Sequence, residues 1–157
     1  SVDPYNLIKE QLIRENNLLI FLDGKKMDLY TYNRIFLLGA GKGVAPMCKA
    51  MEELLGGDLY KSNIIVKYDH LVDLDKTTIY QAGHPIPDDN TLLGTNKIIK
   101  DLINLKADDC VFVLLTGGGS ALLEILAADI TLDDLQAIQH THHHSGLCKQ
   151  HCTGAYV

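Results

Sequence analysis

RIFLLGAGKG, residues 34–43, is the segment that decides the fold. Its first five residues form a short and almost continuous apolar run, which is typical of a buried strand and too short for a surface helix. A glycine-rich turn follows. The next segment, residues 44–55, places apolar side chains at helical spacing until Gly56-Gly57 ends the helix. The sequence therefore predicts a buried strand, a glycine turn and a helix in succession.

The same alternation of strands and helices continues on both sides of this segment. Asp3-Pro4 has the form of an N-cap followed by a first-turn proline, and Thr131 with Asp134 has the spacing of a capping box. The run at residues 110–115 contains no strongly polar residue, which predicts a central parallel strand covered on both faces. Helices are predicted at residues 4–17, 44–55, 89–106, 120–123 and from 132 onward, and strands at residues 34–38, 63–67, 77–81 and 110–115. This order predicts an α/β fold with a mostly parallel sheet and helices on both of its faces.

Two glycine-rich loops directly follow predicted strands, so both are expected at the carboxyl edge of the sheet, where α/β proteins bind ligands. In the first loop, Gly39, Gly41 and Gly43 are placed to present backbone N–H groups to a phosphate or carboxylate, with Lys42 adding a positive charge. The alternative is a tight turn that needs glycine, with Lys42 only solvated. The dinucleotide fingerprint needs glycine at Val44, and a Walker A loop needs Ser or Thr at Gly43, so neither motif matches.

The second loop contains three consecutive glycines and is the more specific feature. Gly117, Gly118 and Gly119 are costly in chain entropy and most useful where a ligand approaches the backbone, so we predict that they bind an anion. The alternative is a tight corner between a strand and a helix. Ser120 would donate a hydrogen bond to a phosphoryl or substrate oxygen, or serve only as a helix cap.

His84 lies between Gly83 and Pro85, in a stiff loop after a predicted strand, which would orient its imidazole at small entropic cost. In a functional role, His84 would bind an oxyanion or move a proton. The alternative is a purely structural hydrogen bond. Asp88 is predicted to cap the helix that follows.

Composition narrows the classes of function. The formal net charge is -6, from 14 Lys and Arg against 20 Asp and Glu, and no basic face is evident, so we expect no nucleic acid partner. No apolar run approaches the roughly 18 residues of a spanning helix, and no signal-peptide pattern opens the chain. The four cysteines do not form a disulfide framework. We therefore expect a cytoplasmic protein without a membrane partner.

Taken together, the motifs resemble those of the type-2 glycerate kinases. Each motif is unspecific alone, but their order and spacing match that family from the N-terminus to about Ile138. Thr116 stands where the family usually has Ser, which keeps a hydroxyl at this position. The matching segments are Val2-Asp3-Pro4-Tyr5, Gly39-Ala40-Gly41-Lys42, Ala82-Gly83-His84-Pro85-Ile86-Pro87-Asp88, Thr116-Gly117-Gly118-Gly119-Ser120-Ala121-Leu122-Leu123 and Ile130-Thr131-Leu132.

The resemblance implies a Rossmann-like N-terminal domain, a three-layer sandwich that faces a second, C-terminal domain across a cleft. It implies transfer of the γ-phosphoryl group of ATP to D-glycerate, with Mg²⁺, to give 2-phosphoglycerate, and it points to Lys42 as the catalytic residue. The expected substrate- and phosphate-binding residues are Gly39, Gly41, His84, Gly117, Gly118, Gly119 and Ser120. We expect glycerate and a nucleotide as partners and no protein metal ligand, and we leave a homodimer open. Two other classes stay open as well: a noncatalytic anion- or nucleotide-binding domain, and a nicotinamide-dependent oxidoreductase resembling hydroxypyruvate reductase.

Residues 139–157 depart from the family. There the family continues with an apolar helix and an Asn-x-Val-Arg segment, whereas this chain has five of its seven histidines and two cysteines. The spacing of Cys148 and Cys152 does not match a standard zinc site. We therefore divide the chain into an N-terminal domain at residues 1–138 and a poorly ordered tail at residues 139–157, for which a shifted reading frame is one explanation. We expect the fragment to be inactive alone.

Overall fold

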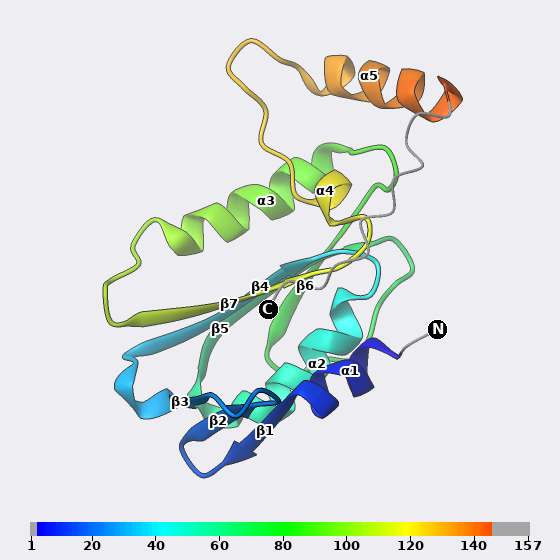
Figure 1. The fold of residues 1–157 in the computed structure, drawn as a ribbon. Coiled ribbons are helices and arrows are strands. Elements are labelled where there is room, and N and C mark those ends of the chain that lie inside the picture. The colour runs from blue at the N-terminus through cyan, green and yellow to red at the C-terminus, as the bar shows by residue number, and fades with distance from the viewer. Residues whose placement is uncertain (1–2, 146–157) are drawn as a thin grey trace.

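The computed structural model describes residues 3–145, and its centre is a four-stranded parallel sheet (Figure 1). The strands are β4 (Arg34–Ala40), β5 (Leu59–Lys67), β6 (Thr77–Ala82) and β7 (Asp109–Leu115), in the spatial order β6-β5-β4-β7. All three strand pairs are parallel. The predicted α/β class and the parallel sheet are therefore confirmed.

Helices cover both faces of this sheet and make a three-layer arrangement (Figure 1). On one face α1 (Pro4–Gln11) and α2 (Val44–Leu55) pack against Ile35 and Leu37 of β4, and on the other α3 (Asp89–Leu102) and α4 (Gly119–Leu122) pack near Leu38. Successive side chains of a strand point to opposite faces, so the continuous apolar run of β4 supplies both cores.

The order of the connections creates a switch point in the sheet. The chain runs from β4 through α2 to β5 and on to β6, and then α3 carries it back across the sheet to β7 on the other side of β4. The segments that follow β4 and β7, α2 and α4, lie on opposite faces of the sheet, and such a switch point is where open α/β sheets bind ligands. Both glycine-rich loops lie at that position.

The predicted helix at residues 4–17 is wrong in its second half. The helix ends at Gln11, and the chain continues into an antiparallel sheet of β1 (Leu12–Glu15), β2 (Leu18–Phe21) and β3 (Lys26–Asp28). Leu12 is 3% exposed and Ile13 is 58% exposed, an alternation that fits a strand. Asn16 adopts a positive φ of 54° in the turn, a conformation that asparagine tolerates.

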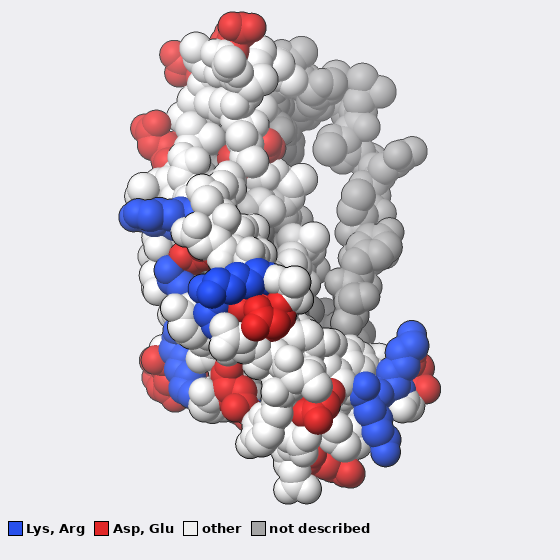
Figure 2. Space-filling view, turned by 90° about the vertical axis from the view of Figure 1, so that its left-hand side faces the viewer, with Lys and Arg blue, Asp and Glu red and all other residues white. Residues whose placement is uncertain are grey.

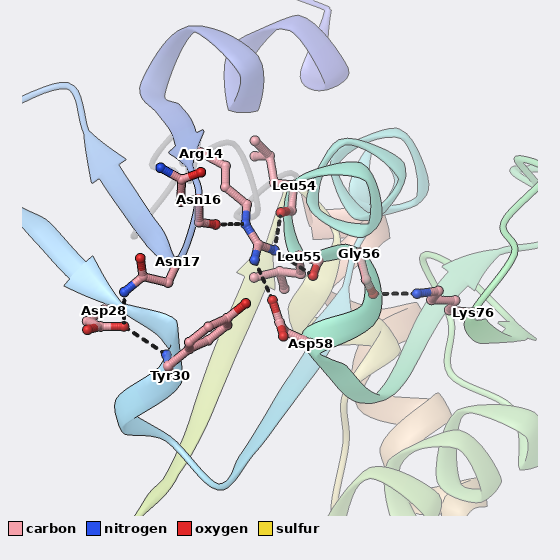
Figure 3. Close-up of polar contacts among 10 residues, drawn as sticks. All are labelled: Arg14, Asn16, Asn17, Asp28, Tyr30, Leu54, Leu55, Gly56, Asp58 and Lys76. Atoms are coloured by element: carbon pink, nitrogen blue, oxygen red, sulfur yellow. Dashed lines mark hydrogen bonds and ion pairs between the residues drawn. The ribbon is translucent and has the colours of Figure 1, made fainter.

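Arg14 fastens this small sheet to the end of α2 (Figure 3). Its guanidinium donates hydrogen bonds to the carbonyl oxygens of Leu54 and Leu55, at 2.9 and 2.8 Å, and pairs with Asp58 at 2.5 Å. A helix C-terminus leaves carbonyls without partners and carries a partial negative charge, so one arginine satisfies several acceptors there. Two short 3₁₀ turns, Leu29–Thr31 and Gly56–Asp58, complete this region.

β7 was predicted to be a central strand, whereas among residues 3–145 it lies at the edge of the sheet, where Val113 and Leu115 are 48% and 37% exposed. An apolar run predicts that a strand can be buried on both faces, but it does not predict which strands lie beside it.

The C-terminal part of the described chain is helical. The predicted helix from Ser120 is a single turn, α4, whereas α5 (Leu132–Ser145) begins at the predicted position with the expected reciprocal bonds between Thr131 and Asp134. This helix runs seven residues past the boundary that we placed at Ile138, and the remaining tail, including Cys148 and Cys152, lies outside the described residues. No helix of the described part is long and apolar enough to cross a membrane.

Candidate functional site

Three loops meet at the carboxyl edge of the sheet. They are the first glycine loop, residues 41–43 after β4, the histidine loop, residues 83–88 after β6, and the triple-glycine loop, residues 116–120 after β7. The first and third of these flank the switch point between β4 and β7. The structure thus brings the predicted site residues of the three loops to one edge.

The first glycine loop is held by its own backbone amides. The N–H of Gly41 donates to the carbonyl of Ile65 at 3.1 Å, that of Lys42 to the carbonyl of Gly117 at 3.1 Å, and that of Gly43 to Oγ1 of Thr116 at 3.0 Å. The expectation that this loop offers these amides to an anion therefore does not fit the observed conformation. The loop is better described as a support for the triple-glycine loop.

Glycine is required at positions 39 and 41 because β4 and the first glycine loop lie close to Leu114 of β7 and to Thr116. A Cβ on Gly39 would lie 2.5 Å from Cγ2 of Val44 and 2.8 Å from the carbonyl oxygen of Leu114. Gly41 has a φ of 139°, and a Cβ there would collide with the hydroxyl of Thr116. Both glycines permit packing at the switch point, which is the alternative that the sequence left open.

The triple-glycine loop contains backbone amides that are not engaged within the described protein. Within residues 3–145, the N–H groups of Gly117, Gly118 and Ser120 have no acceptor in the protein, whereas Gly119 donates to the carbonyl of Thr116 at 3.0 Å. Gly118 caps α4 in the left-handed conformation, with a φ of 86°, so the alternative role of Ser120 as the cap is not observed. Gly117 and Ser120 are exposed, and backbone amides that are not engaged within the protein are suited to bind an anion.

His84 contacts this loop. A Cβ on Gly118 would lie 2.5 Å from Nε2 of the imidazole, so the ring occupies the space that the missing side chain leaves open. His84 is half-buried and precedes a cis peptide bond to Pro85. The predicted neighbourhood of His84 and the glycines is therefore present as a direct contact.

Asp88 holds the histidine loop in place. Its carboxylate accepts hydrogen bonds from the Thr91 amide at 3.0 Å and from the Tyr68 hydroxyl at 2.7 Å, and Thr91 completes the capping box. Burial acts to raise the pKa of Asp88, but hydrogen bonds from Tyr68, Gly83 and Thr91 outweigh it and lower the pKa below its ordinary value. The same contact with Asp88 raises the pKa of Tyr68.

Two further groups complete the site. Gln136 of α5 donates to the carbonyl of Pro87 at 2.8 Å, which connects the last described helix to the histidine loop. The side chain of Lys42 is exposed, and in the described part of the chain its ammonium group makes no ion pair. Lys42 therefore remains available to a ligand at this edge.

Sequence reasoning missed three residues of the site. Thr116 was treated as a neutral replacement although its hydroxyl ties the two glycine loops together, and a hydroxyl directly before a glycine run was the available signal. Tyr68 and Gln136 gave no signal, because both reach the histidine loop through contacts between distant residues.

The opposite end of the sheet contains a cavity of about 500 Å³, lined by residues that include Leu29, Ile35 and Tyr60. None of the glycine-rich loops contributes to it. Figure 2 looks toward the amino ends of the strands and shows acidic and basic side chains intermixed on that face, without a continuous basic surface. We therefore place the candidate site at the carboxyl edge.

Comparison with known proteins shows the family of the chain. Residues 1–150 match the sequence profile of a family described as "Domain of unknown function (DUF4147)". The chain belongs to this family. It is 30% identical over 136 residues to a glycerate 2-kinase from Pyrococcus horikoshii, and 36% identical over 107 residues to a D-glycerate 2-kinase from Thermotoga maritima. These alignments cover 87% and 68% of the chain, and the resemblance to glycerate kinases is confirmed.

A solved structure shares the fold. The crystal structure of the PH0495 protein from Pyrococcus horikoshii superposes with a TM-score of 0.80, at 30% identity, over 92% of the chain. The match covers 32% of that structure, and the chain spans 30% and 26% of the two kinases. A third relative, 35% identical over 105 residues and covering 67% of this chain and 27% of its own, is named as a putative hydroxypyruvate reductase from Agrobacterium vitis.

Proposed function

We propose that this chain is the phosphate-binding part of a glycerate kinase, which transfers the γ-phosphoryl group of ATP to D-glycerate. The observation that carries the proposal is the set of amides that have no acceptor within residues 3–145, those of Gly117, Gly118 and Ser120, beside His84 at the switch point. Amides fixed in this way bind phosphate oxygens without reorganisation. The names of the two kinase relatives supply the chemical class.

In this proposal each group has one task. The triple-glycine loop binds a phosphate through its backbone, and His84 donates a hydrogen bond to the same oxyanion or to a glycerate oxygen. Lys42 approaches from the other side of the switch point and offsets the charge that develops on the transferred group. Thr116 holds the two loops at a fixed separation, because its hydroxyl accepts from the Gly43 amide.

Mg²⁺ would enter on the phosphates of the nucleotide, as it does in most phosphoryl-transfer sites. Within residues 3–145 no group of three or more His, Cys, Asp and Glu side chains is arranged to hold a metal, so we assign the ion no protein ligand here. Cys48 and Cys110 are free thiols, which favours a reducing compartment, and we place the reaction in the cytoplasm.

An oxidoreductase is the second candidate, and the name of the Agrobacterium relative favours it. Against it, Val44 occupies the position where the dinucleotide fingerprint has glycine, and the amides of Lys42 and Gly43 are engaged within the protein. A pyrophosphate at the start of α2 would need those amides.

Isothermal titration of the chain with MgATP, D-glycerate, NADH and inorganic phosphate tests the proposal. We expect heat from MgATP and glycerate, none from NADH, and a weaker MgATP response in Lys42→Ala. Binding of NADH without MgATP would favour the oxidoreductase. Binding of phosphate with no gain from the nucleotide would favour a noncatalytic anion-binding domain.

A further inference from the structure

The histidine loop is held at both of its ends by one residue, Tyr68. β5 and β6 pair in parallel up to Lys67 and Ala82, and just beyond this pair the amide of Tyr68 donates to the carbonyl oxygen of Ala82 at 3.3 Å. The Tyr68 hydroxyl donates to Oδ2 of Asp88 at 2.7 Å. One residue of the connection between β5 and β6 therefore ties together the two ends of the loop that carries His84.

The two carboxylate oxygens of Asp88 have separate partners. Oδ1 accepts from the amide and the hydroxyl of Thr91, at 3.0 and 3.3 Å, and so completes the cap of α3. Oδ2 accepts from Tyr68 and lies beside Gly83, where a Cβ would be 3.2 Å from it. The hydrogen bond from Tyr68 can therefore be removed without removing a donor of the helix cap.

Between these ends the histidine loop folds back on itself. A Cβ on Gly83 would lie 2.4 Å from the carbonyl oxygen of Ile86, so no side chain fits at the start of the loop. His84 follows directly, and its Nε2 lies 2.5 Å from the position of a Cβ on Gly118. A short loop that is closed at its base leaves the imidazole few other positions relative to the triple-glycine loop.

Tyr68 is itself fixed by its neighbours. Asn90, in the first turn of α3, donates to the Tyr68 hydroxyl at 2.7 Å. The chain then turns at Asp69, which has a φ of 64° and whose amide donates to Oε1 of Gln81 at 3.1 Å. The hydroxyl of Tyr68 thus has both a donor and an acceptor within the protein, although the residue is 39% exposed. Its orientation is therefore set by the protein.

We propose that Tyr68 is a positioning residue of the candidate site, which holds the histidine loop closed and thereby keeps His84 against Gly118 before a ligand binds. The inference rests on the proposed function, because it takes His84 as a group that contacts the ligand. Tyr68 acts through His84 and does not bind the ligand directly, since its hydroxyl already has two partners. The connection between β5 and β6 is then part of the support of the site.

A double-mutant cycle of Tyr68→Phe and His84→Ala tests this coupling. Binding of MgATP and of inorganic phosphate to the 157-residue chain is measured by isothermal titration, below the thermal midpoint of every variant. We expect Tyr68→Phe alone to weaken binding about tenfold, and the same change to weaken it less than about twofold when His84 is already Ala. Tyr30→Phe is the matched control, because Tyr30 is 71% exposed at the opposite end of the sheet, and it should bind like the wild type.

NMR of the chain without ligand tests the position of His84 separately. The imidazole signals of His84, identified by their absence in His84→Ala, and the amide signal of Gly118 should shift or broaden in Tyr68→Phe and stay unchanged in Tyr30→Phe. Unchanged signals in Tyr68→Phe would overturn the proposal. Losses of affinity that add up in the double variant would overturn it too, by assigning the Tyr68 hydroxyl to the ligand.

The two measurements separate this proposal from the proposed function. A wild type that binds neither MgATP nor phosphate would overturn the proposed function, and the NMR comparison would still decide whether Tyr68 positions His84. A wild type that binds MgATP, with His84 signals that Tyr68→Phe leaves in place, would overturn the role of Tyr68 alone.

Discussion

At Gly118 the backbone has a φ of 86°, and a Cβ built there would lie 2.5 Å from Nε2 of His84. Gly118→Val should therefore displace the imidazole and block close approach to the loop amides, whereas Ser120→Ala removes one exposed hydroxyl. We expect MgATP affinity to fall at least tenfold more in the glycine variant, about 1.4 kcal/mol, measured by isothermal titration. Equal and small losses in two folded variants would contradict a backbone cradle.

Asp88 makes the histidine loop sensitive to acid. The pKa of Asp88 is lowered in the folded state, so the carboxylate stabilises the protein above its unfolded pKa, and this stabilisation is lost as the pH falls through the lowered value. Asp88→Asn should lower the urea midpoint at pH 7, and the gap from wild type should narrow toward pH 3. The control is Asp89→Asn, since Asp89 is exposed in the same helical turn. A gap that is constant with pH would contradict a role for the ionised carboxylate.

At the scale of elements, the link between the antiparallel sheet and α2 depends on Arg14 (Figure 3). The Arg14 side chain is 20% exposed, and its removal would leave two carbonyls and Asp58 without this donor. Arg14→Ala should destabilise the fold by about 2 kcal/mol, or lower the thermal midpoint by roughly 4–8 °C. Lys25→Ala breaks the exposed pair with Asp23, where Lys25 is 81% exposed, and should change little. Similar small shifts of the thermal midpoint in both variants would show that the Arg14 contacts do not stabilise the packing of the antiparallel sheet against α2.

The elements that the sequence predicted well are those whose signal is local. β4, α2 and α3 follow from an apolar run, a helical period and a helix cap at Asp88, all of which lie within a few neighbouring residues. The hairpin after Gln11 was missed because Leu12 and Ile13 also fit a helical period, and the turn at Asn16 was not given enough weight. The position of β7 at the edge of the sheet formed by residues 3–145 depends on its neighbours, which its composition alone does not reveal.

The candidate site divides in the same way. Lys42, His84 and the three glycines were found because loops after parallel strands share one edge. The different roles of the two glycine loops were not predicted, because they depend on which amides donate hydrogen bonds between loops that are far apart in sequence. For Asp88 the helix cap was predicted from its place before a helical pattern, whereas its hydrogen bond with Tyr68 was not predicted.

At the scale of the whole molecule, the site occupies one edge of one sheet. The chain spans about 30% of the length of the Pyrococcus kinase, and the described loops bring one cation without an ion pair, Lys42, to the edge. Phosphoryl transfer needs positive charge or hydrogen-bond donors on several sides of the moving group, with water excluded by closure. A chain that supplies only one side of such an active site can bind a ligand without catalysing its reaction.

We therefore expect no appreciable glycerate kinase activity from the 157-residue chain, even where it binds MgATP. The Asn-x-Val-Arg segment of the type-2 kinases, with its arginine, has no counterpart in this sequence. Loss of one charge-stabilising group commonly costs 100-fold to 1,000-fold in rate, so we expect turnover of the 157-residue chain to stay at background. A coupled assay with ATP, Mg²⁺ and D-glycerate measures this, with Lys42→Ala as the control for contaminating kinases. Robust turnover by the wild type that disappears in Lys42→Ala would contradict the prediction, because it would mean that Lys42 and the three loops already form a complete site.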